Sequence, residues 1–325
     1  MKRREFIVLL GGVIAWPLVA QGQQTSKIRT VGFLYPGTAA AAPSRIAAFL
    51  AGLRAGGFRE PEDVEIVAKV SGGDAALLDA MTADLVKRKV DLILAISPTA
   101  VRSARSATTT IPILASDLES DPVDSGFIAS VRRPGGNVTG VFLDFPDFSK
   151  KWLELLKETV PQLTSVGVFW DPATGATKLK AVEAAAQTLK LKLEIIELHK
   201  RADLESAFQS PELRDVGGLL FLSSPIIGTN TKILADLTLA QRLPAVTLFT
   251  DFARDGGLMA YGPNLLAVFR QSGVLAAKIL RGDTPAELPI ETPTKFEFVL
   301  NLKTAKILGA HVPASVLLRA DEVIE

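Results

Sequence analysis

The chain has 325 residues, of which 48% are hydrophobic, and its formal net charge is +1 at neutral pH. A chain of this length can bury more than one core, so two domains are expected. The near-neutral charge provides no basic surface of the kind that nucleic acid requires, and no nucleic-acid partner is expected. With no cysteine and two histidines, His199 and His311, the chain has no thiol nucleophile and too few soft ligands for zinc.

The N-terminal 22 residues are typical of an export signal. A basic segment, residues 2–4, precedes an apolar run at 7–19 that is short for a membrane span and contains two glycines and a proline. Arg3-Arg4 followed by Phe6-Ile7 also fits a twin-arginine signal, so the general and the twin-arginine export routes both stay open. Because no cysteine follows to carry a lipid, we expect a mature protein that is free in the periplasm and not inserted in the membrane.

The first half of the mature chain alternates predicted strands and helices. Apolar, β-branched runs predict strands at 29–34, 64–70, 90–96 and 111–115, and helical spacing predicts helices at 44–55, 74–89 and 99–107. Strands that are apolar on both faces and alternate with helices indicate a parallel sheet covered on both sides. The first half is therefore expected to be a doubly wound α/β lobe.

A crossing point follows at residues 121–140. Asp121-Pro122 is a helix-start signal, and the run Pro134-Gly135-Gly136-Asn137 would end the short helix before a strand at 138–142. The α/β alternation then restarts. Strands are expected at 165–170, 193–198, 218–222, 245–249, 258–260 and 296–300, and helices at 149–160, 177–190, 203–208, 231–241, 264–281 and 303–308. The second half thus predicts a second α/β lobe.

Five segments carry a resemblance to a known family: DPV at 121–123, RPGGNVTG at 133–140, GGLMAYG at 256–262, PTKFE at 293–297 and RADEVI at 319–324. In this order they resemble the substrate-binding proteins of ABC transporters, in the subgroup often labelled tryptophan/tyrosine-type. The resemblance implies a type I periplasmic-binding-protein fold, two doubly wound parallel-sheet lobes joined by a multi-strand hinge. It also implies that residues 28–143 plus 257–293 form lobe 1, and that residues 144–256 plus 294–325 form lobe 2.

Six predicted strands end in a small polar or acidic residue just before a helix. In open α/β sheets, ligands bind at the carboxyl ends of the strands, although the same residues can simply cap the helices. Hydroxyls of Ser97, Thr99 and Ser223 would suit a ligand carboxylate, and Asp117, Glu119, Asp171 or Asp251 an ammonium group. The full set of ligand-binding candidates is Tyr35, Thr38, Ser97, Thr99, Asp117, Glu119, Asp171, Thr174, Ser223, Ser224, Thr250, Asp251 and Tyr261. Tyr261, in the GGLMAYG segment, is the preferred aromatic contact, whereas Trp170 could equally be core.

No motif for catalysis is found. Residues 135–140, GGNVTG, precede a predicted strand, whereas a dinucleotide-binding loop follows one, and no P-loop, G-x-S-x-G or H-E-x-x-H is present. We therefore expect no catalytic residue, metal or cofactor, and no enzyme activity.

The resemblance implies a monomeric solute-binding protein whose lobes close around a small molecule and present it to a membrane permease with its ATPase. A periplasmic sensor subunit is the alternative. Two loops depart from the family: residues 171–175 replace an asparagine-proline-asparagine type loop, and 223–227 an aspartate-proline-aromatic run. Because specificity depends on such loops, an aromatic or branched amino acid, another small carboxylate and a nucleoside-like compound all remain open as ligands.

Overall fold

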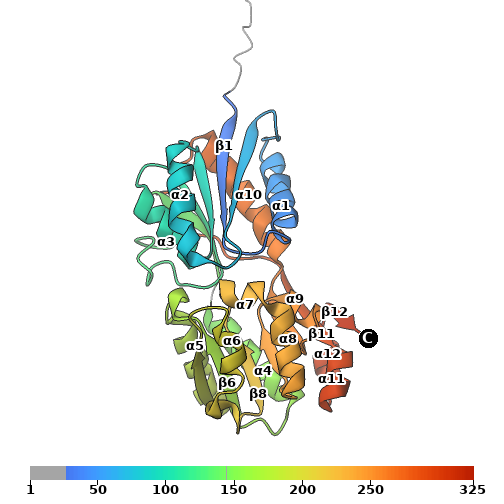
Figure 1. Cartoon of the computed structure of the whole chain (residues 1–325). Coiled ribbons are helices and arrows are strands. Elements are labelled where there is room, and N and C mark those ends of the chain that lie inside the picture. The colour runs from blue at the N-terminus through green and yellow to red at the C-terminus, as the bar shows by residue number, and fades with distance from the viewer. Residues whose placement is uncertain (1–26, 144) are drawn as a thin grey trace, which may run out of the picture.

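The computed structural model describes residues 27–143 and 145–325, with side chains at 145–147 left out of the description. Two α/β lobes lie one above the other, the chain passing between them near the middle of the molecule (Figure 1). The predicted export signal at 1–22 lies outside the described residues. Of the helices that the structure describes, none is both long and apolar enough to cross a membrane.

The first lobe is built on five parallel strands in the order β2-β1-β3-β4-β5. Their bounds are β1 Arg29–Tyr35, β2 Val64–Val70, β3 Leu92–Ile96, β4 Ile113–Asp117 and β5 Val138–Phe142. The helices that follow the first three strands are α1 Ala42–Ala55, α2 Leu78–Lys87 and α3 Ser97–Ala107. Strands β3, β4 and β5 are almost wholly buried, which confirms the predicted sheet covered on both faces.

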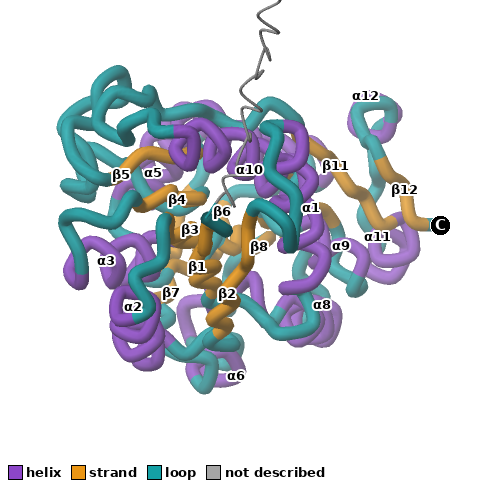
Figure 2. Tube along the Cα trace, turned by 90° about the horizontal axis from the view of Figure 1, so that it is seen from above, coloured by secondary structure: helices purple, strands orange, loops and turns teal. Residues whose placement is uncertain are grey.

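A helix from the far end of the sequence completes this lobe. Helix α10, Leu265–Arg281, lies against α1, and the two are side by side in both views of the backbone (Figures 1 and 2). Glycines make the close approach possible, because a Cβ on Gly52 would lie 2.0 Å from the Arg270 carbonyl oxygen, and one on Gly273 would lie 2.1 Å from that of Phe49. The first lobe is therefore assembled from two stretches of the chain.

The second lobe has a seven-stranded sheet in the order β12-β11-β10-β9-β8-β6-β7, parallel except for the β10–β11 pair. Its strands are β6 Ser165–Trp170, β7 Lys192–Glu197, β8 Gly218–Phe221, β9 Ala245–Thr247, β10 Met259–Pro263, β11 Phe296–Asn301 and β12 Glu322–Ile324. Its helices are α4 Phe145–Thr159, α5 Thr177–Leu189, α6 Asp203–Ala207, α7 Pro225–Thr229, α8 Thr231–Ala240, α9 Thr250–Arg254, α11 Leu302–Leu308 and α12 Ala314–Leu317.

The chain passes between the lobes after β5, between β10 and α10, and again before β11. The two doubly wound lobes with multiple crossings confirm the predicted fold class. One boundary differs, because β10 pairs with β9 and β11 in the second sheet, whereas residues 257–263 were expected in lobe 1. The chain crosses at Asn264, whose side chain caps α10 by accepting the Ala267 amide at 2.7 Å.

The helix predicted after Asp121 is absent. Asp121 Oδ1 does accept the amides of Val123 and Asp124, at 2.8 and 2.7 Å, as a capping side chain would. The segment that follows is a series of turns, with Gly126 at a φ of 68°. That left-handed conformation interrupts the helix after a single turn, so the capping signal was correct and the inferred helix was wrong.

Candidate functional site

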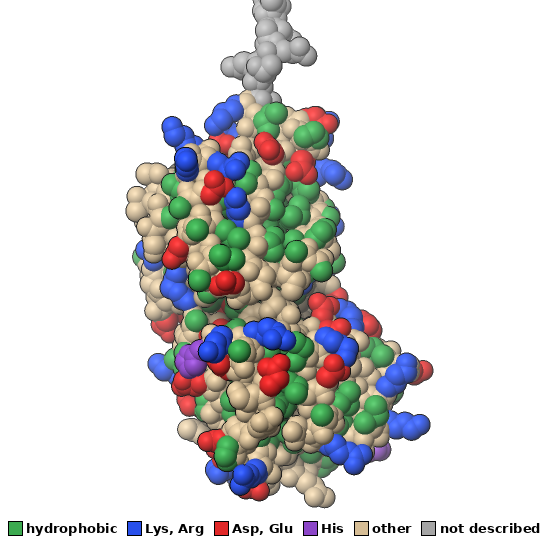
Figure 3. All heavy atoms as spheres, in the orientation of Figure 1, with side chains coloured by type: hydrophobic (Ala, Val, Ile, Leu, Met, Phe, Trp, Pro, Cys, Tyr) green, Lys and Arg blue, Asp and Glu red, His purple; other side chains and the backbone are tan. Residues whose placement is uncertain are grey.

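The carboxyl ends of the two sheets face each other, and cavities lie between them. A cavity of about 630 Å³, here called the polar cavity, has walls from both lobes. The first lobe contributes the loops after β1 and β2 together with Thr99, and the second lobe contributes Asp171, the 199–201 loop and α7. In the space-filling view, basic and acidic side chains gather along the second lobe's edge of the waist between the lobes (Figure 3).

A second cavity, here called the apolar cavity, measures about 80 Å³. Its walls share Pro36, Pro225 and Thr229 with the polar cavity, so the two spaces adjoin. Aromatic and aliphatic side chains of both lobes form most of the remaining wall, including Tyr35, Leu118, Phe249, Leu265, Val268 and Phe269. Such a wall suits the apolar part of a small ligand.

Tyr35 is held in place at the end of β1. Its side chain is 8% exposed, and its ring meets that of Phe269 edge-on, with centroids 6.4 Å apart. A Cβ on Gly37 would lie 2.1 Å from the Tyr35 ring, so only glycine fits beside it. Burial raises the pKa of the Tyr35 hydroxyl, which therefore stays neutral as a hydrogen-bonding group.

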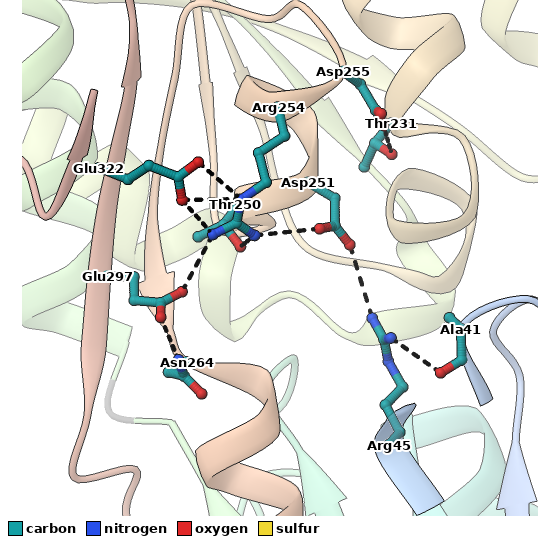
Figure 4. A network of polar contacts seen from close by, with 10 residues as sticks. All are labelled: Ala41, Arg45, Thr231, Thr250, Asp251, Arg254, Asp255, Asn264, Glu297 and Glu322. Carbon is teal, nitrogen blue, oxygen red and sulfur yellow. Dashed lines mark hydrogen bonds and ion pairs between the residues drawn. The ribbon is translucent and has the colours of Figure 1, made fainter. Parts of the chain in front are cut away.

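One ion pair spans the lobes at this cavity. Arg45 Nη2, from α1, lies 3.9 Å from Asp251 Oδ2, from α9, and both residues line the apolar cavity. Arg254 Nη1 lies 3.4 Å from the other oxygen of Asp251. Arg254 is held in turn by Glu322 at 2.7 Å and Glu297 at 3.8 Å, which ties α9 to β11 and β12 (Figure 4).

Four ionisable side chains are buried together elsewhere between the lobes: Asp117, Glu119, Asp171 and Lys178, here called the buried charge cluster. Asp117 is saturated by its own loop, accepting the amides of Glu119 and Ser120 at 2.8 and 3.0 Å and the Ser120 hydroxyl at 2.5 Å. Lys178, which is fully buried, donates to the carbonyl oxygen of Ser223 and to its hydroxyl at 3.2 Å.

The cluster has perturbed ionisation. Burial raises the pKa of Asp117 to about 6 and that of Glu119 to about 8, and the nearby Lys178 ammonium opposes both shifts. Burial also lowers the pKa of Lys178 to about 8, while the surrounding acids oppose this shift. Glu119 Oε2 is buried without a hydrogen-bond partner. The Ser223 hydroxyl donates to the carbonyl oxygen of Leu118 at 3.3 Å, and so links the lobes beside the cluster.

The sequence-based candidates divide into groups. Tyr35, Ser224 and Asp251 line the apolar cavity, and Thr38, Thr99 and Asp171 line the polar cavity. Thr250, with Asp251, lines a third cavity of about 210 Å³ beside α9. The candidates that line none of these three cavities are Ser97, Asp117, Glu119, Thr174, Ser223 and Tyr261.

Tyr261 shows why a sequence motif does not fix a residue's place. Its ring stacks on Phe148 at 5.4 Å and meets Phe298 edge-on, in the core of the second lobe.

Ser97 and Thr174 are engaged in local hydrogen bonds. Ser97 has a φ of 75° at the end of β3, and its hydroxyl is hydrogen-bonded to that of Thr99 at 2.8 Å. Thr174 donates to the Asp171 carbonyl oxygen at 2.8 Å, inside its own turn.

Capping and cavity lining coincide at several positions. Ser224 Oγ accepts the Ile227 amide at 3.2 Å, Thr38 Oγ1 the Ala41 amide at 3.2 Å, and Asp171 Oδ1 the Ala173 amide at 2.9 Å. Each of these residues also lines a cavity. Capping and cavity lining are therefore compatible at these positions.

Sequence reasoning missed Arg45, Phe249, Phe269 and Lys178. Arg45 and Lys178 lie in helices, where a basic residue is usually part of a solvated face, and no local pattern marks either as buried. In the described part of the chain, no group of three or more His, Cys, Asp or Glu side chains could hold a metal ion.

A two-lobed α/β fold with cavities between facing sheet edges is that of a periplasmic binding protein. The family model for ABC transporter substrate binding proteins matches residues 41–324, and the chain belongs to this family.

Three relatives illustrate the likeness. A tyrosine-binding protein of Clostridioides difficile is 25% identical over 265 residues, 80% of this chain and 75% of that protein. A Vibrio cholerae conserved domain protein superposes with a TM-score of 0.85 at 25% identity, over 91% of this chain and 100% of its own. The ABC domain from Streptococcus pneumoniae in complex with L-Trp has a TM-score of 0.84 at 23% identity, over 91% of this chain and 100% of its own.

A ligand-free, open substrate-binding protein with adhesive properties from Clostridium difficile scores lower. Its TM-score is 0.66 at 22% identity, over 91% of this chain and 99% of its own.

Proposed function

We propose that this protein is the periplasmic solute-binding component of an ABC importer, and that it closes two lobes around an amino acid or another small carboxylate. The observation that carries the proposal is the pair of adjoining cavities whose walls come from both lobes. A ligand held there contacts both sheets at once, so its binding energy favours the closed arrangement of the lobes.

The relatives support the choice of ligand class. One is named as a tyrosine-binding protein, and another was solved with L-Trp. The apolar cavity is lined by the rings of Tyr35 and Phe269 from the first lobe and of Phe249 from the second, and so suits an aromatic side chain. The higher superposition score on the L-Trp complex than on the open, ligand-free relative supports a closed arrangement of the lobes here.

The remaining parts of the proposal follow from the family. After removal of residues 1–22 the protein would be a free periplasmic monomer that delivers its ligand to a membrane permease with its ATPase. No covalent step is assigned to the cleft, and the closed lobes would form the surface that a permease recognises.

The proposal is tested by ligand-dependent stability. The protein from Gln23 onward is stripped of bound ligand by unfolding and refolding, then melted with panels of amino acids, small carboxylates, nucleosides and sugars. A ligand at 100 times its Kd adds about 2.7 kcal/mol to the free energy of unfolding. Stabilisation by amino acids or carboxylates, with a smaller radius of gyration in solution scattering, supports the proposal. A response confined to nucleosides or sugars, or to none of the panels, contradicts the ligand class.

A further inference from the structure

The apolar cavity contains two opposite charges that come from different lobes. Arg45 lies on α1 of the first lobe and Asp251 lies in the first turn of α9 in the second. Among the ion pairs of the described residues, theirs is the only one that joins the lobes. Arg45 is 13% exposed and Asp251 is 56% exposed, so one charge is held inside the cavity and the other stands at its opening.

Both charges have unused bonding capacity. Their 3.9 Å separation exceeds hydrogen-bond length, and the Arg45 guanidinium donates one further bond, to the Ala41 carbonyl oxygen at 3.2 Å. A guanidinium has five N–H donors in a fork that matches a carboxylate. Asp251 keeps its contact with Arg254 on one oxygen, and its other oxygen faces Arg45 (Figure 4).

The apolar wall begins directly beside these charges. The Arg45 guanidinium lies 5.8 Å from the centroid of the Tyr35 ring. The space of about 80 Å³ is smaller than an amino acid with a branched or aromatic side chain. A guest of that size must therefore part contacts in the wall, and the Arg45–Asp251 contact, which is 3.9 Å long and partly exposed, is a weak one.

We propose that Arg45 and Asp251 recognise the two charges of an α-amino acid, with Arg45 binding the carboxylate and Asp251 the ammonium group. The side chain of the amino acid, branched or aromatic, lies against Tyr35, Phe249 and Phe269. This assignment rests on the proposed function and gives it a specificity rule. Because the two charges belong to different lobes, only a ligand that carries both can replace the Arg45–Asp251 contact on closure; an amine or an acid pairs with one and leaves the other exposed.

The test pairs two charge-removing variants with ligands that lack one charge each. Stripped wild type, Arg45→Gln and Asp251→Asn are titrated calorimetrically with L-tryptophan, tryptamine and indole-3-propionate, and with L-leucine, isoamylamine and 4-methylvalerate. In the wild type, an amino acid should bind more tightly than either of its analogues. Arg45→Gln should lower the affinity for the amino acid and for the acid by roughly tenfold to a hundredfold, which is the range for a lost charge-assisted hydrogen bond. The affinity for the amine should stay almost unchanged. Asp251→Asn should lower the affinity for the amino acid and for the amine to a similar degree, and leave the affinity for the acid almost unchanged.

A matched control is available in the first lobe. Asp84 lies on α2 and Arg88 lies just beyond its end, and they form an exposed pair in which Arg88 Nε is 2.8 Å from Asp84 Oδ2. Neither residue lines the apolar or the polar cavity. Arg88→Gln and Asp84→Asn should leave all six affinities unchanged, and thermal unfolding should show every variant folded.

The outcomes separate the two proposals. Suppose that the wild type binds an amino acid, and that each variant lowers the affinities for the amine and the acid equally or lowers neither. The assignment of Arg45 and Asp251 is then overturned, while the proposed function stands. If the wild type binds neither amino acid, both the assignment and the amino-acid class are overturned.

Discussion

The two polar regions between the lobes differ in how their charges are arranged. At the apolar cavity, Arg45 and Asp251 are separated by 3.9 Å beside open space. In the buried charge cluster, Lys178 is fully buried, bonded to Ser223 and surrounded by three acids. A loosely paired charge beside a cavity can exchange its partner for a ligand at little cost, whereas a charge in a filled interior cannot. On the assignment proposed above, the first region selects the ligand, and the second contributes to the contact between the lobes.

The largest expected effect is on Lys178. At neutral pH, Lys178→Met should lower the free energy of unfolding by about 3–5 kcal/mol, because it leaves Asp117, which is ionised above its pKa of about 6, buried without the nearby cation. Denaturant titration measures the loss, and Arg45→Met is the matched change at the apolar cavity. Equal losses in Lys178→Met and Arg45→Met would remove the distinction between the regions.

The cluster should also make stability depend on pH. The pKa of Glu119 rises from 4.5 to about 8 on folding, so between these values the folded protein binds a proton that the unfolded chain has lost. Its contribution to stability therefore falls as the pH rises from 4.5 to about 8. Asp117 acts in the same direction between 3.8 and about 6. Lys178, whose pKa falls from 10.5 to about 8, acts in the opposite direction above that value.

Glu119→Gln isolates this effect. The variant should show a less steep fall of unfolding free energy with rising pH than the wild type between 4.5 and about 8. The measurement is denaturant unfolding at a series of pH values, with Asp251→Asn as the control from the apolar cavity. Parallel curves for wild type and Glu119→Gln would show that Glu119 ionises normally.

A smaller effect is expected at Ser223. Ser223→Ala removes the 3.3 Å bond to the Leu118 carbonyl oxygen and one acceptor of Lys178, at a cost of roughly 1 kcal/mol. Since one of these bonds joins the lobes, solution scattering of the ligand-free protein should show a shift toward a larger radius of gyration. Ser224→Ala, which removes only a helix cap, serves as control; a shift of the same size in both variants would mean that the inter-lobe bond has no separate role.

The smallest effect on stability is expected at Arg45. Because its partner Asp251 is more than half exposed, Arg45→Gln should change the free energy of unfolding by less than about 1 kcal/mol, although it should change ligand affinity much more. Comparing thermal unfolding with and without L-tryptophan separates the two quantities. A loss of stability as large as that of Lys178→Met would place Arg45 with the structural charges.

Local patterns were sufficient for the strands and helices that carry the sheets. The apolar runs at β1, β3 and β4 and the helical spacing in α1 and α10 predicted elements that the structure confirms, because buried elements must match their period of burial. The short elements α7, α9 and β12 were missed, whereas α6, β8 and β9, which are equally short, were predicted. The strand ends were also informative, because six of the 13 candidate residues line the polar or the apolar cavity.

By itself, the sequence determined two α/β lobes, the family and the use of small polar residues at the strand ends. Only the tertiary structure decided that β10 pairs in the second sheet, that Tyr261 packs against Phe148, and that Arg45 meets Asp251 across the lobes. The physical reason is the range of the interactions. Periodicity and capping act over a few residues and are written in local sequence. The partners of Arg45 and Lys178 come from segments far apart in the chain: Asp251 reaches Arg45 only when the lobes are packed together, and Ser223 reaches Lys178 only when the second lobe is folded.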